Sequence, residues 1–311
     1  DWGLDLPKDF MKEEGTEDDF DGEPVPDPKT KMGELWILGD HKLLVGDATK
    51  REDVERLMGT EKAQCVFTDP PYNVDYTGGM GTHEQNKREG ILNDKMSNDN
   101  FRQFCVDFCK NLTEFCDGAI YICMSSSELA NLKPAFESGG GHWQSFIIWA
   151  KNTFTLSRSD WQNQYEPILY GWRDDVVNHY FLGFRNEGNV WKEEPTDEEL
   201  LKWAKQRIKK TLTDVWEEKK PTKNTEHPTM KPLKLCAKAI NASSLRGEIV
   251  MDLFLGSGST LIAAEQMERK CYGMELDPKY CDVILDRFVE FTGKEPIRED
   301  GMAWSELKQV S

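Results

Sequence analysis

The tetrapeptide Asp69-Pro70-Pro71-Tyr72 combines residue types that could hold and present an amino group. Each proline biases the residue before it towards extended geometry and lacks a backbone N–H, so nearby carbonyl oxygens stay free to accept hydrogen bonds. Asp69 and the Pro70 carbonyl can therefore both accept a hydrogen bond from one NH2 group. The ring of Tyr72 offers a flat face on which a planar ring could stack. The plain alternative is a surface turn with a buried tyrosine.

Two acceptors at one NH2 group would activate an amine that is otherwise a poor nucleophile. The lone pair of the N6 amine of adenine is delocalised into the ring, and it becomes available once both hydrogens are held and the nitrogen pyramidalises. Asp69 would act mainly through positioning and electrostatics, because this nitrogen becomes acidic only after it has received a new group. A base inside a duplex would have to flip out to reach the site, and stacking on Tyr72 would contribute roughly 1–3 kcal/mol.

A second motif lies in residues 254–260, where a tight glycine turn separates a predicted strand from a predicted helix. Gly256 and Gly258 bring bare backbone and helix N–H groups close to a bound ligand. Glu275 ends the next predicted strand, where a carboxylate can accept hydrogen bonds from both hydroxyls of a ribose. The arrangement suits a nucleotide-like cofactor. An ordinary strand-to-helix turn and a dinucleotide-binding dehydrogenase are the alternatives, the latter disfavoured because Leu261 replaces the third fingerprint glycine.

The predicted secondary structure explains how these motifs would be positioned. Apolar runs predict strands and helical spacing predicts helices, with a hairpin in 33–47 as the first ordered element. Both motifs follow strands, at the carboxyl edge where ligand sites of α/β proteins lie. The fold class is therefore α/β, with a doubly wound, mostly parallel sheet and helices on both faces. Further strands are predicted at 63–68, 119–123, 145–149, 167–171, 247–254 and 271–275, and helices at 49–58, 100–115, 125–136, 197–210, 260–267 and 279–290.

Composition divides the chain into successive segments. Residues 1–32 are predicted to be an acidic, disordered linker, because 1–30 hold eleven acidic side chains against three lysines and few apolar ones. A catalytic domain covers 33–151 and 227–292. The residues between them, 152–226, are rich in aromatic, charged and turn-forming types and are predicted to be an inserted domain. The remaining residues, 293–311, are predicted to be a C-terminal tail.

The net charge of −17 argues against a nucleic-acid ligand, because Lys and Arg that neutralise phosphates supply much of the affinity of such complexes. Nearly half of this excess lies in residues 1–30, which softens the objection. The eight cysteines contain no C-x-x-C pair and no histidine at zinc-ligand spacing, so they are predicted to be reduced thiols and no metal is predicted. No apolar run approaches the roughly 18–20 residues that span a bilayer, so no membrane partner is expected.

Four segments resemble motifs of the β group of DNA amino-methyltransferases. In that group the target-amine motif precedes the glycine-rich cofactor motif, and the order in this chain is the same. Asp69 to Tyr72 is similar to the catalytic motif of that family, and Phe254-x-Gly256-x-Gly258 to its cofactor loop. The segment from His227 to Pro232, with Thr229 and Lys231, resembles the motif that flanks the methionine carboxylate. Gly46-Asp47-Ala48 resembles the segment whose aspartate contacts the cofactor adenine. Apart from the family, His227 fits a capping or core histidine, and Asp47 fits a helix N-cap ahead of Thr49.

The resemblance covers about residues 33–292 and implies a seven-stranded methyltransferase sheet, an inserted target-recognition domain at 152–226 and S-adenosylmethionine as the cofactor. It extends to Trp149-x-Lys151 and Tyr165-Glu166-Pro167. Members that act on cytosine N4 more often carry Ser in place of Asp69, which favours adenine N6 in double-stranded DNA. Catalysis is assigned to Asp69, Pro70, Pro71 and Tyr72, and cofactor binding to Asp47, Ala48, Asp69, His227, Thr229, Lys231, Asp252, Phe254, Gly256, Ser257, Gly258 and Glu275.

Other functions stay open from the sequence. They are methylation of cytosine N4, methylation of an RNA or protein amine, and a catalytically silent module that binds DNA or cofactor, which the intact tetrapeptide disfavours. The basic cluster at 202–210 suits either phosphate contacts or a solvated helix face. The acidic start resembles chains in which a ParB-like domain precedes this kind of enzyme. The resemblance implies a bacterial or phage protein at the nucleoid in the cytoplasm, and the sequence leaves a homodimer and a partner restriction nuclease open.

Overall fold

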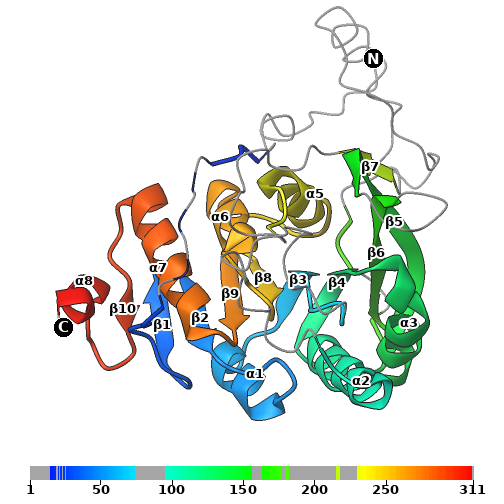
Figure 1. Cartoon of the computed structure of the whole chain (residues 1–311), viewed down its shortest axis with the longest axis horizontal. Coiled ribbons are helices and arrows are strands. Elements are labelled where there is room, and N and C mark those ends of the chain that lie inside the picture. Colours follow the sequence, from blue (N-terminus) through cyan, green and yellow to red (C-terminus); the bar gives the residue numbers. More distant parts are fainter. Residues whose placement is uncertain are drawn as a thin grey trace, which may run out of the picture.

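Figure 1 shows the chain as a computed structural model. It describes residues 15–18, 20, 22, 24, 26–73, 95–155, 163–176, 179–181, 215–217 and 230–309, with the backbone alone at 152–155, 163 and 215–217. His227, Thr229 and the helix predicted at 197–210 lie outside these residues. Within the described ranges, no helix is both long and apolar enough to cross a membrane.

The described strands form a single mixed sheet in the order β10-β1-β2-β9-β8-β3-β4-β6-β5-β7. Its centre is parallel from β2 through β9, β8 and β3 to β4, while β6 runs antiparallel between β4 and β5. The seven strands from β2 to β5 agree with the predicted sheet, and β10, β1 and β7 extend it at its edges. The strands are β1 (Leu35–Leu38), β2 (His41–Val45), β3 (Ala63–Thr68), β4 (Cys116–Cys123), β5 (Gly141–Thr155), β6 (Asn163–Arg173), β7 (Val215–Glu217), β8 (Ile249–Asp252), β9 (Lys270–Glu275) and β10 (Ile297–Arg298).

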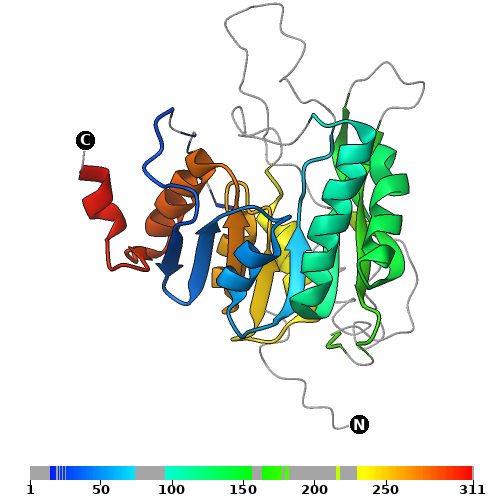
Figure 2. The ribbon, with the colours of Figure 1, turned by 90° about the horizontal axis from the view of Figure 1, so that it is seen from below.

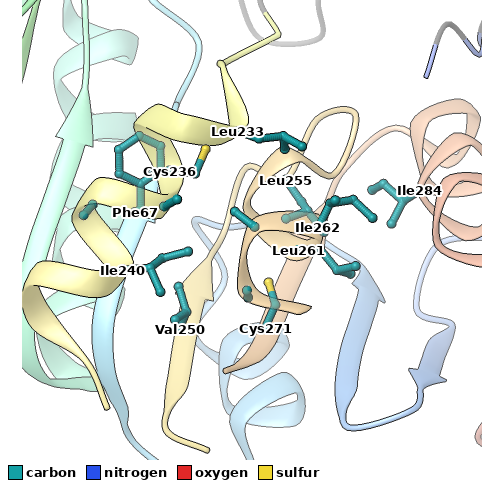
Figure 3. Packing of buried hydrophobic residues seen from close by; sticks show 14 of the residues in the cluster. Phe67, Leu233, Cys236, Ile240, Val250, Leu255, Leu261, Ile262, Cys271 and Ile284 are labelled. Carbon is teal, nitrogen blue, oxygen red and sulfur yellow. The ribbon is translucent and has the colours of Figure 1, made fainter. Parts of the chain in front are cut away.

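The alternation of side chains along the strands creates two hydrophobic cores, one on each face of the sheet. In β3, Cys65 and Phe67 face one core, and Val66 between them faces the other. Helices α5, α6 and α7 cover the first face, as the packed side chains in Figure 3 show, and α1, α2 and α3 cover the second, in front of the sheet in Figure 2. The helices are α1 (Arg51–Met58), α2 (Asn98–Glu114), the short 3-10 helix η3 (Ser126–Glu128), α3 (Leu129–Ser138), α5 (Leu233–Ser243), α6 (Ser259–Gln266), α7 (Pro278–Thr292) and α8 (Trp304–Gln309).

Local sequence signals account for the ends of α7. The carboxylate of Asp277 accepts a hydrogen bond from the Lys279 N–H at 2.9 Å, and Pro278 occupies the first helical turn, where no backbone donor is needed. Gly293 ends the helix in a left-handed conformation with φ 69°, which a side chain would disfavour. This capping fixes the residue at which the helix begins after β9. Glu275, the last residue of β9, lies two residues before the cap, so the capping helps to fix its position.

The N-terminal boundary of the insert predicted at 152–226 was wrong. Residues 163–173 form β6 inside the core sheet, with Ile168 paired to Cys123 of β4 and to Ile147 of β5. The apolar run that begins at Pro167 is buried on both faces, so this strand belongs to the catalytic domain rather than to an insert. Helix α5 was not among the predicted helices, although its apolar side chains Leu233, Cys236 and Ile240 belong to the core that Figure 3 shows.

The predicted C-terminal tail is also part of the fold. Strand β10 pairs antiparallel with β1, and Trp304 of α8 is 2% exposed. Its ring meets that of Trp36 edge-on with ring centroids 5.6 Å apart, and its indole N–H donates to Asp286 at 2.7 Å. A tryptophan side chain buries a large apolar surface, so this one residue can attach an otherwise polar segment to the core. The interpretation of these residues as a peripheral tail was therefore wrong.

The prediction of a disordered linker is wrong for the described residues of the acidic start. The carboxylate of Glu17 accepts hydrogen bonds from the Leu233 and Lys234 N–H groups at 3.0 and 3.1 Å, at the beginning of α5. Asp18 forms a two-point ion pair with the buried Arg287 at 2.7 and 2.8 Å. Acidic side chains are favourable at a helix N-terminus and beside a guanidinium, so charge rather than apolar burial attaches this segment.

Candidate active site

Asp69 lies at the carboxyl end of β3, as predicted from the tetrapeptide. Strand β4 ends beside it, because β3 and β4 are parallel and pair from Ala63 to Thr68. Since β6 is antiparallel to β4, its first residues reach the same edge, and Glu166 lies there. Lys231 reaches this edge from the segment that leads into α5. Four parts of the chain thus contribute to one site. Two of them carry the charged residues Glu166 and Lys231, and no local sequence pattern predicted that these two would be in contact.

Lys231 is the centre of a buried ion-pair network. Its Nζ lies 2.6 Å from Oδ2 of Asp69 and 2.8 Å from Oε1 of Glu166, and its side chain is 8% exposed. The other oxygen of Glu166 accepts a hydrogen bond from Nζ of Lys151 at 2.8 Å. The sequence predicted Lys231 as a cofactor contact, whereas the structure places its ammonium against the side chain predicted to hold the target amine.

Tyr72 also points its hydroxyl into this network. The hydroxyl lies in hydrogen-bond contact with Oδ1 of Asp69, 2.7 Å from Oε1 of Glu166 and 3.2 Å from Nζ of Lys231. A phenol has one proton, so it can donate to only one of the two carboxylates at a time while accepting from the ammonium. Its ring packs on the same core as Phe254, which leaves the predicted role as a stacking face compatible with this position.

Burial and charge act in opposite directions on these groups. Burial alone would raise the pKa of Glu166, but the ammonium groups of Lys231 and Lys151 outweigh it and lower that pKa to about 2. Burial raises the pKa of Asp69, which has one ammonium neighbour where Glu166 has two. Burial alone would lower the pKa of Lys231, and the carboxylates of Asp69 and Glu166 raise it instead. The ammonium therefore stays charged, and the protonation state of Asp69 depends on this positive charge.

The same carboxyl edge carries the glycine turn between β8 and α6. Gly256 has φ 55° and Gly258 has φ 87°, conformations that disfavour any residue with a side chain. An added side chain at Gly256 would meet no atom within 4 Å, so bare backbone there borders open space. Asp252 supports the turn, because its Oδ1 accepts hydrogen bonds from the Phe254 N–H at 3.0 Å and the Thr68 hydroxyl at 2.7 Å.

Glu275 ends β9 beside this turn. Its carboxylate accepts hydrogen bonds from the Gly256 N–H at 2.8 Å and the Asp277 N–H at 2.9 Å. Burial raises the pKa of Glu275 to about 7 and that of Asp252 to about 6. A buried carboxyl with only two backbone donors has lone pairs left for further donors. The open space in front of Gly256 and a carboxyl of this kind fit the predicted nucleotide-like cofactor, whose ribose carries two hydroxyl donors.

Asp47 and Ala48 follow β2, whose last residue, Val45, pairs with Glu275. Oδ1 of Asp47 accepts hydrogen bonds from the N–H and the hydroxyl of Thr49 at 3.0 and 2.7 Å. The N-cap position of α1 is Lys50, so the alternative interpretation of Asp47 as a helix N-cap was wrong. Asp47 lies at the same edge as Glu275, one strand further along, where an adenine attached to that ribose could extend.

Arg287 of α7 is a residue that the sequence analysis missed. Its guanidinium, 1% exposed, donates from Nη1 to the Ser257 carbonyl at 2.8 Å, between the two glycines of the turn. Asp18 holds the other side of the guanidinium. The signal available in the sequence was weak: Arg287 stands at helical spacing among apolar residues, where a buried charge needs a partner that the sequence does not identify.

Three groups at the edge could in principle bind a cation. Oxygens of Asp69 and Glu166 and the sulfur of Cys123 lie within 4.8 Å of one another. Nζ of Lys231 already lies between the two carboxylates and supplies a positive charge there. We therefore assign these groups to the ion-pair network. All eight cysteines of the chain are free thiols in the structure, as predicted.

Comparisons with known proteins identify the family of this chain. A family model described as DNA methylase matches residues 63–286. The Type II methyltransferase M2.DpnII of Streptococcus pneumoniae is 24% identical over 242 residues, which cover 74% of this chain and 84% of that protein. Two other relatives are matched over smaller shares of their lengths, 44% and 48%.

Solved structures show the same fold. The M1.HpyAVI-SAM complex matches with a TM-score of 0.54 and 21% identity, and the match covers 79% of this chain and 97% of that one. The cytosine-N4-specific PvuII DNA methyltransferase matches with a TM-score of 0.54 and 14% identity, over 84% of this chain and 88% of that one. At these identities the likeness concerns the arrangement of strands and helices, and not the choice of target base.

Proposed function

We propose that this chain, which belongs to the DNA methylase family and is an S-adenosylmethionine-dependent DNA amino-methyltransferase, methylates the N6 amino group of adenine in double-stranded DNA. The observation that carries the choice of base is Asp69 at the end of β3, because members of the family that act on cytosine N4 more often carry Ser there. Oδ2 of Asp69 contacts Lys231 and Oδ1 contacts Tyr72, and each oxygen has a second lone pair for the amine. Cytosine N4 is the alternative target, and the family includes both kinds of enzyme.

The residues of the chain would act on the amine in three ways. Asp69 and the Pro70 carbonyl accept hydrogen bonds from the two hydrogens of the NH2 group, which directs the nitrogen lone pair out of the base plane. Tyr72 stacks on the flipped base. The bound cofactor supplies the methyl group as a sulfonium, so that an N–C bond forms from the amine lone pair, the S–C bond breaks with its electrons going to sulfur, and one amine proton is released.

Cofactor binding is proposed for the second half of the edge. The bare backbone of Gly256 and Gly258 would approach the cofactor, with Phe254, Ser257 and Asp252 shaping the turn. Glu275 would accept the ribose hydroxyls, and Asp47 with Ala48 would border the adenine. His227 and Thr229 stay predictions from the sequence, since they lie outside the described residues. Target recognition is proposed for the chain between β6 and Lys231, which narrows the insert predicted at 152–226.

The test of this proposal is identification of the methylated product. Unmodified DNA is incubated with the protein and labelled S-adenosylmethionine, digested to nucleosides and analysed by mass. We expect the label in N6-methyladenine. Label in N4-methylcytosine would overturn the choice of base and keep the reaction class. Label absent from DNA but present in RNA or protein supplied in parallel would overturn the DNA substrate.

Glu275 gives a prediction for cofactor affinity and its pH dependence. Ribose hydroxyls donate to the ionised carboxylate, so binding should tighten as Glu275 loses its proton around pH 7. Isothermal titration is expected to show a dissociation constant for S-adenosylmethionine that falls about tenfold between pH 6 and pH 8. Glu275→Gln should bind about tenfold more weakly at pH 8 and lose this slope, because a neutral amide no longer titrates. The exposed control Glu268→Gln should keep it.

The same carboxyl affects folding with the opposite sign. In the cofactor-free protein its pKa is raised from 4.5 to about 7, so the folded state keeps a proton that the unfolded chain has lost. Between these two pH values its contribution makes the protein less stable as the pH rises. A cofactor affinity that does not change with pH in the wild type would contradict the proposed contact.

A further inference from the structure

The position of Lys231 is not explained by the proposed function alone. During transfer, positive charge moves from the sulfonium to the amine nitrogen, and an ammonium next to that nitrogen opposes this charge. Nζ of Lys231 lies 2.6 Å from Oδ2 of Asp69, and the carboxylate of Asp69 is one of the two groups expected to hold the amine. If Lys231 were paired with Asp69 alone, the pair would be neutral and Asp69 would attract the amine less.

Glu166 changes this balance. Its Oε1 lies 2.8 Å from Nζ of Lys231, which thus contacts both carboxylates, and its side chain is 9% exposed. The three groups Asp69, Lys231 and Glu166 together carry one net negative charge. The second cation, Lys151, contacts Oε2 of Glu166, the oxygen that does not face Lys231, and is connected to Asp69 through Glu166. The side of the network that faces the amine is therefore anionic.

Lys231 also separates two carboxyl groups that would otherwise compete for a proton. The hydroxyl of Tyr72 contacts an oxygen of each, which places Asp69 and Glu166 across one bridging atom. Two carboxylates this close do not both stay ionised at neutral pH without a cation between them. A protonated Asp69 would be a weaker acceptor for the amine. The titratable and charged groups that face Asp69 are Tyr72 on its own loop, Lys231 before α5, Glu166 on β6, Cys123 on β4 and Asp252 on β8.

We propose that Lys231 and Glu166 are positioning residues for the reaction: Lys231 keeps Asp69 ionised, and Glu166 compensates the charge of Lys231 so that the amine meets a net negative site. This inference rests on the proposed function, in which Asp69 holds the target amine. It assigns a role to Glu166, for which the sequence predicted none, and it changes the role of Lys231 from a cofactor contact to a partner of Asp69.

The test compares pH profiles of single-turnover methylation at saturating cofactor. In Lys231→Met, one of the two carboxyls takes up a proton, so the acidic limb of the rate profile should move up by at least about one pH unit, with recovery at high pH. Lys231→Arg keeps a cation and should keep the wild-type limb. Glu166→Gln should lower the rate about tenfold or more without a change in cofactor affinity. Lys133→Met, which removes a lysine from a surface ion pair, should match the wild type.

A second measurement does not depend on the reaction. Carbon-13 labelled Asp and Glu carboxyls are titrated by NMR in the wild type and in Lys231→Met, with assignments from Asp69→Asn and Glu166→Gln. We expect both carboxyls to be ionised at neutral pH in the wild type, and one of them to titrate at a clearly higher pH in Lys231→Met than in the wild type. If Lys231→Met does not fold, the wild-type titration and Lys231→Arg still decide the question.

Three results would overturn the inference. One is a wild-type carboxyl of the pair that is still protonated at neutral pH. Another is a Lys231→Met profile that is lower but unshifted, with unchanged carboxyl titrations. The third is a large loss of cofactor affinity in Lys231→Met with an unshifted profile, which would return Lys231 to the cofactor site. If the wild type methylates no DNA, the proposed function fails, whereas the carboxyl titrations still test the role of Lys231.

Discussion

Asp69→Ala is expected to reduce the rate of methyl transfer by at least about 100- to 1,000-fold and to leave cofactor affinity within a few-fold of the wild type. Loss of one well-placed polar partner of a reacting group typically lowers turnover by this amount. The substitution removes one of two acceptors for the target amine. Of the two carboxylates that contact Lys231, only Glu166 then remains. The net negative charge beside the amine is therefore lost as well.

Single-turnover methylation of DNA with labelled cofactor measures the rate, and isothermal titration measures cofactor affinity. Asp69→Asn is a useful second variant, because it keeps the shape of the side chain but turns an NH2 donor towards the amine or the ammonium. It should be as defective as Asp69→Ala. The control is Asp99→Asn, on a side chain that is 95% exposed at the start of α2. A rate within a few-fold of the wild type in Asp69→Ala would remove Asp69 from the mechanism.

Asp18→Asn is expected to destabilise the protein by about 3 kcal/mol and to weaken cofactor binding. The guanidinium of Arg287 is almost fully buried and depends on Asp18 for its compensating charge. Removal of one partner from a buried ion pair typically costs about 3–5 kcal/mol. Because Arg287 also donates to the Ser257 carbonyl, a shift of the guanidinium should disturb the glycine turn.

Urea denaturation with and without S-adenosylmethionine measures both effects. Asp27→Asn, on an exposed residue of the same segment, should match the wild type. In a double-mutant cycle with Arg287→Met, the Asp18 substitution should have little further effect once the guanidinium is gone. A chain that begins at Lys31 should be destabilised as well, because it also lacks the Glu17 contacts at α5. Unchanged stability in Asp18→Asn and in the shortened chain would mean that the segment does not hold Arg287 in solution.

The sequence by itself determined the elements that carry the two motifs. Strands β3, β8 and β9 are short apolar runs that end at polar residues, and period and length alone identify them. Parallel strands bring their carboxyl ends to one edge, so Asp69, the glycine turn and Glu275 were correctly expected near one another. The β1–β2 hairpin was also predicted, because Gly39 and Asp40 interrupt two apolar runs.

Tertiary structure alone decided how charges are shared at that edge. Tyr72 and Glu166 are 94 positions apart, Lys231 and Asp69 are 162 apart, and Arg287 and Asp18 are 269 apart. In the sequence none of these residues identifies its partner, and only packing removes enough water to make a particular partner necessary. Hydrophobic period determines which face of a strand or helix is buried, but it contains no information on which buried charges meet. The fold was therefore readable from the chain, whereas the ionisation of Asp69 and the attachment of the acidic start depend on contacts that exist only once the sheet and its helices have assembled.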